Sequence, residues 1–233
     1  MNTDNHSLRI EPIGGVSQIG SNMTLVKGQQ SAIYIDCGIL FPYDDAFDIN
    51  YLIPDLHHLD PVDALVISHG HEDHIGAICH FAQQFPQTPI YAPRFAYALI
   101  RDKLQRENVP ASVYQYRPFE ELKFTDFCVV PHQVNHSIPD TFGLHITSKN
   151  LDLSVFFCSD FKVDPRTPYE PLFDLPKLHR EARGHSRRLL FPDSTNILSS
   201  QDKTFSESDL IPALRKNLSE SPGRCFLTTF SSN

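Results

Sequence analysis

Short apolar or alternating runs, separated by turn residues, recur along the chain and predict strands. These runs are residues 8–13, 23–27, 31–36, 63–67, 89–91, 112–116, 127–131, 142–148, 153–158, 189–191 and 224–230. Lys149-Asn150 predicts a tight hairpin turn between the strands 142–148 and 153–158.

Three other segments have the periodicity or the start signals of helices. They are residues 74–85, residues 94–107 and residues 206–218, the last with Ser206 as the expected N-cap. Sheets with helices before, between and after them favour a layered α/β (α+β) fold. In such a fold two sheets pack face to face and helices cover the outer faces.

The composition is that of an ordinary globular protein, with 233 residues of which 40% are hydrophobic and 21% are charged. This length is enough for one domain with a sizeable core, so we expect one domain over residues 1–233. No start signal for export and no apolar stretch of membrane-spanning length occurs in the sequence. The five cysteines include no Cys-x-x-Cys pair, which predicts reduced thiols. We therefore expect a cytoplasmic protein that does not contact membranes.

The densest chemistry lies in Ser68-His69-Gly70-His71-Glu72-Asp73-His74, on a loop between a buried strand and a helix. On this loop His69 and His71 can hold one cation, while Asp73 and His74 can reach a second cation beside it. Neutral imidazole and carboxylate suit zinc and, less strongly, manganese or iron. A polar loop with solvated histidines is the alternative, but such loops rarely concentrate three imidazoles in six positions.

Three more candidate residues follow strands, where a rigid scaffold usually carries its site. His136 can supply a third imidazole to the first cation, and Asp160 has two oxygens with which to bridge both cations. Asp36 can orient a ligand imidazole by accepting its other N–H. A single His or Asp at a strand end is more often a cap or a turn residue, so these assignments depend on the surrounding motifs.

The motif His69–His74 resembles the metal motif of the metallo-β-lactamase superfamily, and several wider blocks are similar to ribonuclease J, a bacterial RNA-processing branch of the β-CASP nucleases. These blocks are Ile13-Gly14-Gly15, Gln18-Ile19-Gly20-Ser21-Asn22-Met23, Ile35-Asp36-Cys37-Gly38, Phe41-Pro42, Tyr51-Leu52-Ile53-Pro54-Asp55, Asn135-His136-Ser137-Ile138-Pro139-Asp140, Ser159-Asp160-Phe161-Lys162 and Asp193-Ser194-Thr195-Asn196. The resemblance implies an αββα sandwich with two metal sites. The implied ligands are His69, His71, His136 and Asp160 for one metal and Asp73, His74 and Asp160 for the other. His132 and His145 match no ligand position of the family pattern.

The activity implied by the resemblance is metal-assisted hydrolysis of single-stranded RNA, from the 5′ end or internally. Two divalent cations about 3.5–4 Å apart, zinc or alternatively manganese, would activate water and clamp the attacking and leaving oxygens. Asp73 would position or deprotonate the water and His74 would fix the second cation, so we expect Asp73 and His74 to be catalytic.

The formal net charge of −8 argues mildly against a protein that coats nucleic acid non-specifically. One basic cluster stands out, although most charge runs are solvated faces. It consists of Lys177, Arg180, Arg183, His185, Arg187 and Arg188. Arg187 and Arg188 of this cluster, together with Ser137 beside His136, are the candidate contacts to RNA.

In the ribonuclease J pattern, a block like Thr228–Asn233 leads into an inserted β-CASP domain and then into a return segment with a Ser-Gly-His motif and another metal-binding histidine. Neither part lies in residues 1–233, so we expect a metallo-β-lactamase-like domain that is incomplete at its C-terminal side. A shortened version, a truncated reading frame and a natural fragment all stay open. Two other functions also stay open: a weak metal-binding module that needs a partner chain or self-association, and a thioester or lactone hydrolase.

Overall fold

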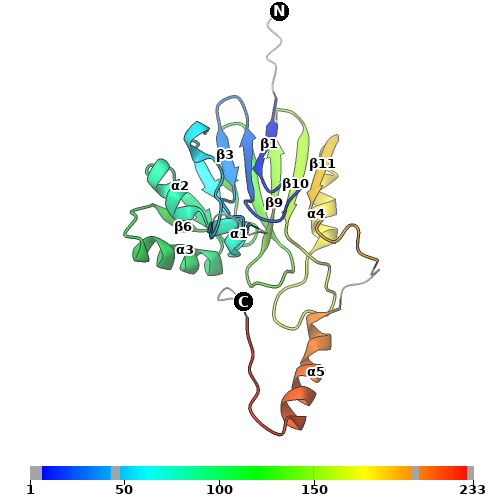
Figure 1. Cartoon of the computed structure of the whole chain (residues 1–233). Coiled ribbons are helices and arrows are strands. Elements are labelled where there is room, and N and C mark those ends of the chain that lie inside the picture. Colours follow the sequence, from blue (N-terminus) through cyan, green and yellow to red (C-terminus); the bar gives the residue numbers. More distant parts are fainter. Residues whose placement is uncertain (1–6, 43–47, 149, 201–204, 230–233) are drawn as a thin grey trace, which may run out of the picture.

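The computed structural model describes residues 7–42, 48–148, 150–200 and 205–229. Two sheets lie face to face, with α2 (Ile78–Gln84) and α3 (Arg94–Arg106) outside one sheet and α4 (Leu175–Ala182) outside the other (Figure 1). The expected sandwich of two sheets between helices is therefore confirmed.

The first sheet has an antiparallel half and a parallel half. In the described residues its order is β1-β2-β3-β4-β5-β6. The strands are β1 (Arg9–Gly14), β2 (Met23–Lys27), β3 (Ala32–Ile35), β4 (Ala64–Val66), β5 (Ile90–Ala92) and β6 (Val113–Gln115). The first three pair antiparallel, and β3 to β6 pair parallel. Parallel strands need long crossovers, which contain α1 (Glu72–Ile75), α2 and α3.

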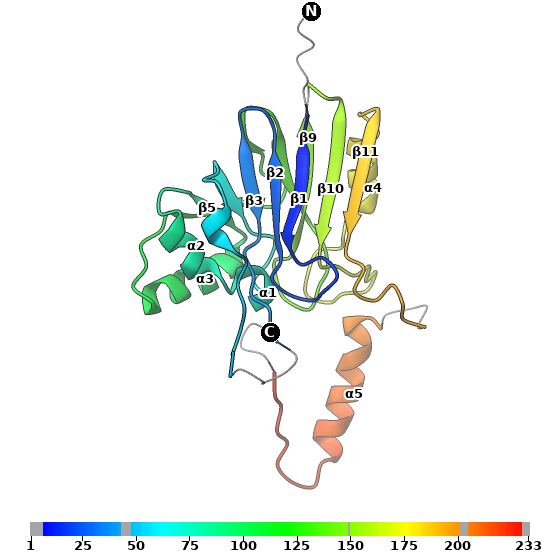
Figure 2. The ribbon, with the colours of Figure 1, turned by 45° about the horizontal axis from the view of Figure 1, so that its top comes forward.

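The second sheet has the order β11-β10-β9-β8-β7 over the described ranges. Its strands are β7 (Leu122–Lys123), β8 (Cys128–Gln133), β9 (Phe142–Ser148), β10 (Leu153–Ser159) and β11 (Arg187–Pro192). The strands β7 to β10 pair antiparallel, whereas β10 and β11 pair parallel with α4 in their crossover. The last helix, α5 (Glu207–Glu220), extends away from the sandwich (Figure 2). None of the helices in the described ranges is long and apolar enough to cross a membrane.

Alternation along the strands divides the apolar side chains between separate cores. Ile33 and Ile35 of β3 face the second sheet and contribute to the central core, whereas Tyr34 between them faces α2 and α3. The third core is much smaller: under α4 it contains Phe156 and a few neighbours, against which Leu178 packs. The helix α4 is thus held by little apolar surface.

The predicted helix 74–85 is wrong in its boundaries, because the structure has two helices there. The first runs from Glu72 to Ile75, and its hydrogen-bond ladder ends at Gly76, whose N–H donates to the Glu72 carbonyl at 2.7 Å. The carbonyl of Asp73 accepts hydrogen bonds from the backbone and side chain of Asn22, both at 3.1 Å. The N–H of Ala77 donates instead to the Cys37 carbonyl at 3.0 Å. Contacts from distant segments therefore interrupt a pattern that is locally helical.

The predicted strand 224–230 is also wrong over its described part, since residues 224–229 form no strand. Phe226 and Leu227 are 87% and 75% exposed, and a strand needs a paired neighbour as well as an alternating sequence. The helix α4 was missed because its charged residues obscured its start, at which Asp174 accepts a hydrogen bond from the N–H of Lys177 at 2.8 Å.

Three smaller expectations concern a helix cap, the cysteines and a hairpin turn. Ser206 is the N-cap of α5, as predicted, and forms a capping box with Asp209. All five cysteines have free thiols. The predicted hairpin turn at Lys149-Asn150 lies partly outside the described residues, although β9 and β10 do pair antiparallel.

Candidate metal centre

The candidate residues gather at one edge of the sandwich, where strands of both sheets end. Ser68 follows β4 and joins the sheets, because its carbonyl accepts a hydrogen bond from the N–H of Phe142 at 3.1 Å. Its hydroxyl also accepts a hydrogen bond from the Ser159 hydroxyl at 2.9 Å. His69 and Asp160 come directly after Ser68 and Ser159. The hydrogen bonds of Ser68 to the second sheet therefore bring His69 and Asp160 to the same edge.

Three imidazoles converge in the first cluster, which consists of His69, His71, His136 and Asp160. The Nδ1 of His71 lies 3.1 Å from Nε2 of His69 and 3.2 Å from Nε2 of His136. Nitrogen ligands at about 2.0–2.1 Å from a tetrahedral zinc ion are about 3.3 Å apart. Asp160 adds a carboxylate oxygen 3.5 Å from Nε2 of His136. The spacing and chemistry of these donors fit one divalent cation.

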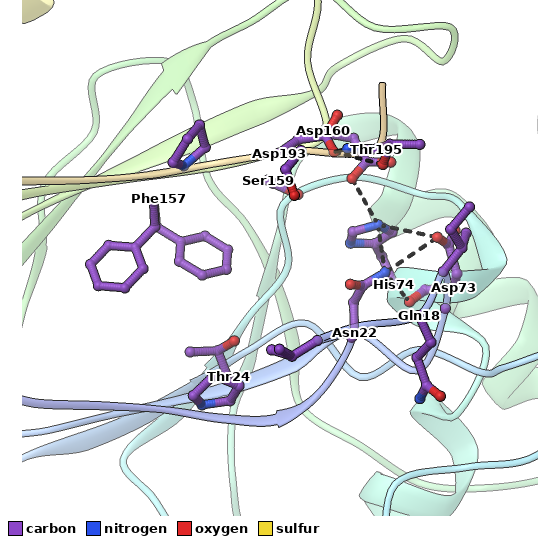
Figure 3. A pocket seen from close by; sticks show the side chains of 18 of the residues that line it. Gln18, Asn22, Thr24, Asp73, His74, Phe157, Ser159, Asp160, Asp193 and Thr195 are labelled. Carbon is purple, nitrogen blue, oxygen red and sulfur yellow. Dashed lines mark hydrogen bonds and ion pairs between the residues drawn. The ribbon is translucent and has the colours of Figure 1, made fainter. Parts of the chain in front are cut away.

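The second cluster consists of Asp73, His74 and Asp160 and lies beside the first. The Nε2 of His74 is 3.5 Å from Oδ2 of Asp73 and 3.5 Å from Oδ1 of Asp160 (Figure 3). The other oxygen of Asp160 faces His136, so this carboxylate lies between the two clusters. The structure therefore brings all six predicted ligands together as two donor sets that share Asp160.

Asp36 contacts the ring nitrogen of His74 that faces away from Asp73 and Asp160. Its side chain is buried, and Oδ2 lies 2.8 Å from Nδ1 of His74. The same carboxylate accepts hydrogen bonds from the N–H and the hydroxyl of Ser68, at 2.7 and 2.8 Å. This arrangement directs Nε2 of His74 towards Asp73 and Asp160, and it agrees with the orienting role expected for Asp36.

Burial and neighbouring charges set the protonation of the imidazoles. Burial lowers the pKa of His69 well below its usual range and lowers the pKa of His136 to about 4. Both rings are therefore neutral at pH 7, which is the form that binds metal. Burial opposes a charge on His74, but Asp36 and Asp160 raise the pKa of His74 well above its usual range. A cation at Nε2 of His74 would have to displace that proton.

Close backbone packing fixes the loop and the short helix α1. A Cβ atom at Gly38 would lie 1.5 Å from the carbonyl oxygen of Asp73, so only glycine allows the two segments to approach this closely. The N–H of Cys37 donates to the His74 carbonyl at 2.8 Å. Asp36, at the end of β3, has a positive φ of 60° that turns the chain towards α1.

A pocket of about 570 Å³ opens beside the second cluster. Asp73, His74 and Asp160 line it, together with the loop from Gly15 to Asn22 and the loop from Asp193 to Thr195. Figure 3 shows Asp73, His74 and Asp160 directed towards one another at the side of this pocket. The second cluster is therefore the part of the centre that opens into this pocket.

The candidate RNA contacts do not all lie near the metal clusters. Arg187 and Arg188 pair with Leu153 and Ser154 at the start of β10, whereas Asp160 follows its end. The six residue steps from Leu153 to Ser159 span about 20 Å. The structure thus does not bring Arg187 and Arg188 to the metal clusters. Ser137 is exposed next to His136.

Asn22 and Glu72 have roles that sequence reasoning did not assign. The amide nitrogen of Asn22 donates to Oδ2 of Asp73 at 3.2 Å and lies 3.1 Å from Nε2 of His74. The position of Asn22 within a block similar to ribonuclease J was the available signal. Glu72, for which no role could be chosen from the sequence, forms an ion pair with Lys103 at 2.8 Å.

Comparison with known proteins identifies the family of the chain. The family model described as "Metallo-beta-lactamase superfamily" matches residues 17–189. "Ribonuclease J" of Synechocystis sp. is 36% identical over 241 residues, covering 100% of this chain and 37% of the relative. "Ribonuclease J" of Corynebacterium glutamicum is 36% identical, with 98% of this chain and 32% of the relative covered. "Ribonuclease J 1" of Streptococcus pyogenes is 37% identical, with 95% and 40% covered. The chain therefore spans about a third to two fifths of the length of these relatives.

A solved structure supports the fold alone. It is described as "Crystal Structure of a Protein of Unknown Function from Enterococcus faecalis V583", with a TM-score of 0.67 at 15% identity, covering 91% of this chain and 57% of that one. The resemblance to ribonuclease J found in the sequence blocks is confirmed along the chain. From the family match, the sandwich and the paired donor clusters, the chain belongs to the metallo-β-lactamase superfamily and has a centre for divalent metal.

Proposed function

We propose that this chain carries the metal centre of a ribonuclease J-type hydrolase that cuts phosphodiester bonds of single-stranded RNA. The observation that carries the proposal is the position of Asp160 between two donor clusters, with one oxygen towards each. The names of the relatives support RNA as the substrate. The exonuclease and endonuclease modes share this chemistry.

The two clusters have different ligand sets. His69, His71, His136 and Asp160 would hold one cation, and three imidazole donors favour zinc there over manganese. Asp73, His74 and Asp160 would hold the second with fewer imidazoles. We therefore expect one tightly bound ion and one weakly bound ion in this centre.

Asp73 and His74 carry the catalytic role in this proposal. Two divalent cations held in such a centre would lower the pKa of water and neutralise the charge that develops on the phosphate. The carboxylate of Asp73 lines the pocket and is oriented by the amide of Asn22, so it can accept a hydrogen bond from the attacking water. His74 is held by Asp36 and keeps Asp73 and Asp160 at a fixed separation.

The pocket offers groups suited to a phosphodiester backbone. Ser194 and Thr195 supply hydroxyl groups on one side, and the loop from Gly15 to Gly20 supplies backbone on the other. Asp193 fixes this side, because its Oδ1 accepts hydrogen bonds from the N–H and the hydroxyl of Thr195, at 2.7 and 2.6 Å. Since the chain carries a net charge of −8, RNA binding here depends on bound cations.

The test combines metal analysis with a single-turnover assay on 5′-monophosphorylated RNA, in the chain alone and in a form extended to the full length of its relatives. We expect the Asp73→Asn variant to lose at least about 100-fold in rate. The control is Asp102→Asn on the exposed face of α3, which removes a carboxylate that pairs with Arg106 and belongs to neither cluster. A variant at Asp73 that cleaves RNA as fast as the Asp102 variant would refute the assignment.

A second candidate is a metal-binding module that works only with another polypeptide surface. The exposed apolar side chains of the C-terminal part favour it, because Leu198 is 96% exposed and Phe226 is 87% exposed. Light scattering on the isolated chain tests this candidate, for which we expect self-association. A monodisperse monomer with full activity would contradict it.

We place the activity in the cytoplasm, supported by five free thiols.

A further inference from the structure

Two histidines lie on the outer face of the second sheet, away from the metal centre described above. Val129, Leu144 and Ile146 of β8 and β9 face the central core. Because side chains alternate along a strand, His132 and His145 face the opposite way, towards α4. His132 pairs with Gly143 in the register, so His145 is its diagonal neighbour on the same face.

The helix α4 covers this face and adds a carboxylate to the two imidazoles. Oε2 of Glu181 is 2.9 Å from Nε2 of His132 and 3.6 Å from Nδ1 of His145. One donor atom from each of the three residues lies within 4.8 Å of the others. His132 and His145 are only 1% and 3% exposed, so the donors converge under the helix instead of on the open surface.

The close contact between Nε2 of His132 and Oε2 of Glu181 does not have the angles of a hydrogen bond. Nε2 of His132 and Oε2 of Glu181 are both buried, and neither has a hydrogen-bond partner of acceptable geometry in the described part of the chain, although they are close. Buried polar atoms without partners are rare in proteins and unfavourable. A cation between the two atoms would satisfy both of them at once.

From this geometry we infer that His132, His145 and Glu181 form a separate zinc site that fastens α4 to strands β8 and β9. Two imidazoles and one carboxylate are a common zinc donor set, with water as the fourth ligand. The site is made of residues that play no part in the clusters around Asp160.

The surroundings prepare each donor for metal. Nε2 of His145 lies 2.8 Å from the hydroxyl of Ser154, which fixes the ring with Nδ1 towards Glu181. Burial lowers the pKa of His132 to about 4 and also lowers the pKa of His145, so both rings are neutral at pH 7. Burial opposes ionisation of Glu181, but its hydrogen bond from Lys177 lowers the pKa of that carboxyl.

Lys177 is a nearby cationic group that opposes a metal ion. Its ammonium group contacts Oε1 of Glu181, which leaves Oε2 for the metal. The ammonium also lies 4.6 Å from the centre of the Phe119 ring, and this contact holds it to one side. The carboxylate can therefore bridge the lysine and a zinc ion through different oxygens.

A zinc ion here would compensate for the weak apolar attachment of α4. The helix, which lies wholly within the described residues, has no buried residue, and Leu178 is its apolar contact with the small core at Phe156. The chain continues from α4 into β11 and then into the Asp193–Thr195 side of the pocket. Fixing α4 thus also limits the movement of that pocket wall.

The test is elemental analysis of the full chain after zinc loading and dialysis, comparing the wild type with Glu181→Gln. Glutamine keeps the shape of the side chain and an oxygen for Lys177 but removes the charged ligand. We expect the variant to hold one zinc ion fewer per chain. The control His179→Ala removes an exposed imidazole from the same helix and should hold as many ions as the wild type.

Crystals of the dialysed wild type provide a second measurement that does not depend on a variant. Anomalous diffraction at the zinc edge should show a peak bonded to His132, His145 and Glu181. Equal zinc content in the wild type and Glu181→Gln, or no anomalous peak between α4 and the sheet, would overturn the proposal. Unchanged occupancy of the clusters around Asp160 shows that Glu181→Gln is folded.

Discussion

Replacing Asp36 by Asn tests whether a buried carboxylate sets the metal affinity of His74. Asp36 is 2% exposed, and Oδ2 contacts both the hydroxyl of Ser68 and Nδ1 of His74 at 2.8 Å. An amide nitrogen in place of Oδ2 cannot accept a hydrogen bond. The His74 ring then has to place its proton on Nε2, the nitrogen that faces Asp73 and Asp160.

The expected magnitude follows from the hydrogen bonds that the substitution removes. A hydrogen bond to a charged group contributes about 1.5–3 kcal/mol, and the Ser68 hydroxyl can rotate to another acceptor. We therefore expect Asp36→Asn to lower the free energy of unfolding of the metal-free protein by about 2–4 kcal/mol. Removal of the group that orients a ligand imidazole should also weaken the second metal site by about 10–100-fold.

Two measurements check these values, with Asp63→Asn as the matched control. Asp63 also accepts a backbone hydrogen bond, from Ala32 at 2.8 Å, but it is exposed and far from the clusters. Denaturant unfolding in a chelator gives the stability, and competition with a chromophoric chelator gives the zinc affinity. If Asp36→Asn binds its weaker ion within about twofold of the wild type, the orienting role of Asp36 is wrong.

Three further predictions concern other contacts. Gly38→Ala should cost about 1–3 kcal/mol or more in denaturant unfolding, because its Cβ would overlap the Asp73 carbonyl. Burial raises the pKa of Tyr34 to about 12, so the phenol stays protonated to a higher pH in the folded state than in the unfolded state. The free energy of unfolding should therefore fall as the pH rises from about 10 to 12. The variant Tyr34→Phe should lack this part of the decrease. Glu72→Gln should cost less than about 1 kcal/mol by the same assay, because the Glu72 and Lys103 side chains are 35% and 29% exposed.

The sheets were predictable because their signals are local. The strands β2 and β9 agree with the predicted ranges 23–27 and 142–148, in which apolar side chains alternate or run together between turn residues. The strand 224–230 has the same local pattern and fails over its described part, because pairing depends on a neighbour that the pattern does not contain. The break in the helix 74–85 depends in the same way on Asn22 and Cys37, which are distant in sequence.

The metal centre was partly predictable for a related reason. Four of its six candidate ligands lie within His69–His74, so their spacing alone indicates chemistry. His136 and Asp160 were assigned through the surrounding blocks, since a single residue after a strand carries little information. The roles of Asn22 and Ser68 depend on contacts between distant segments, and no spacing in the sequence indicates them.

The burial of His132 and His145 could not be predicted from the sequence pattern. Strand periodicity places both on the outer face of the second sheet, and an isolated histidine on such a face is usually solvated. Their burial comes from α4, whose sequence has the appearance of a basic surface run. Glu181, the one acidic residue in that run, is the residue that contacts both imidazoles. The charge pattern that suggested an RNA-binding patch thus contains the carboxylate that turns two buried histidines into a set of metal donors.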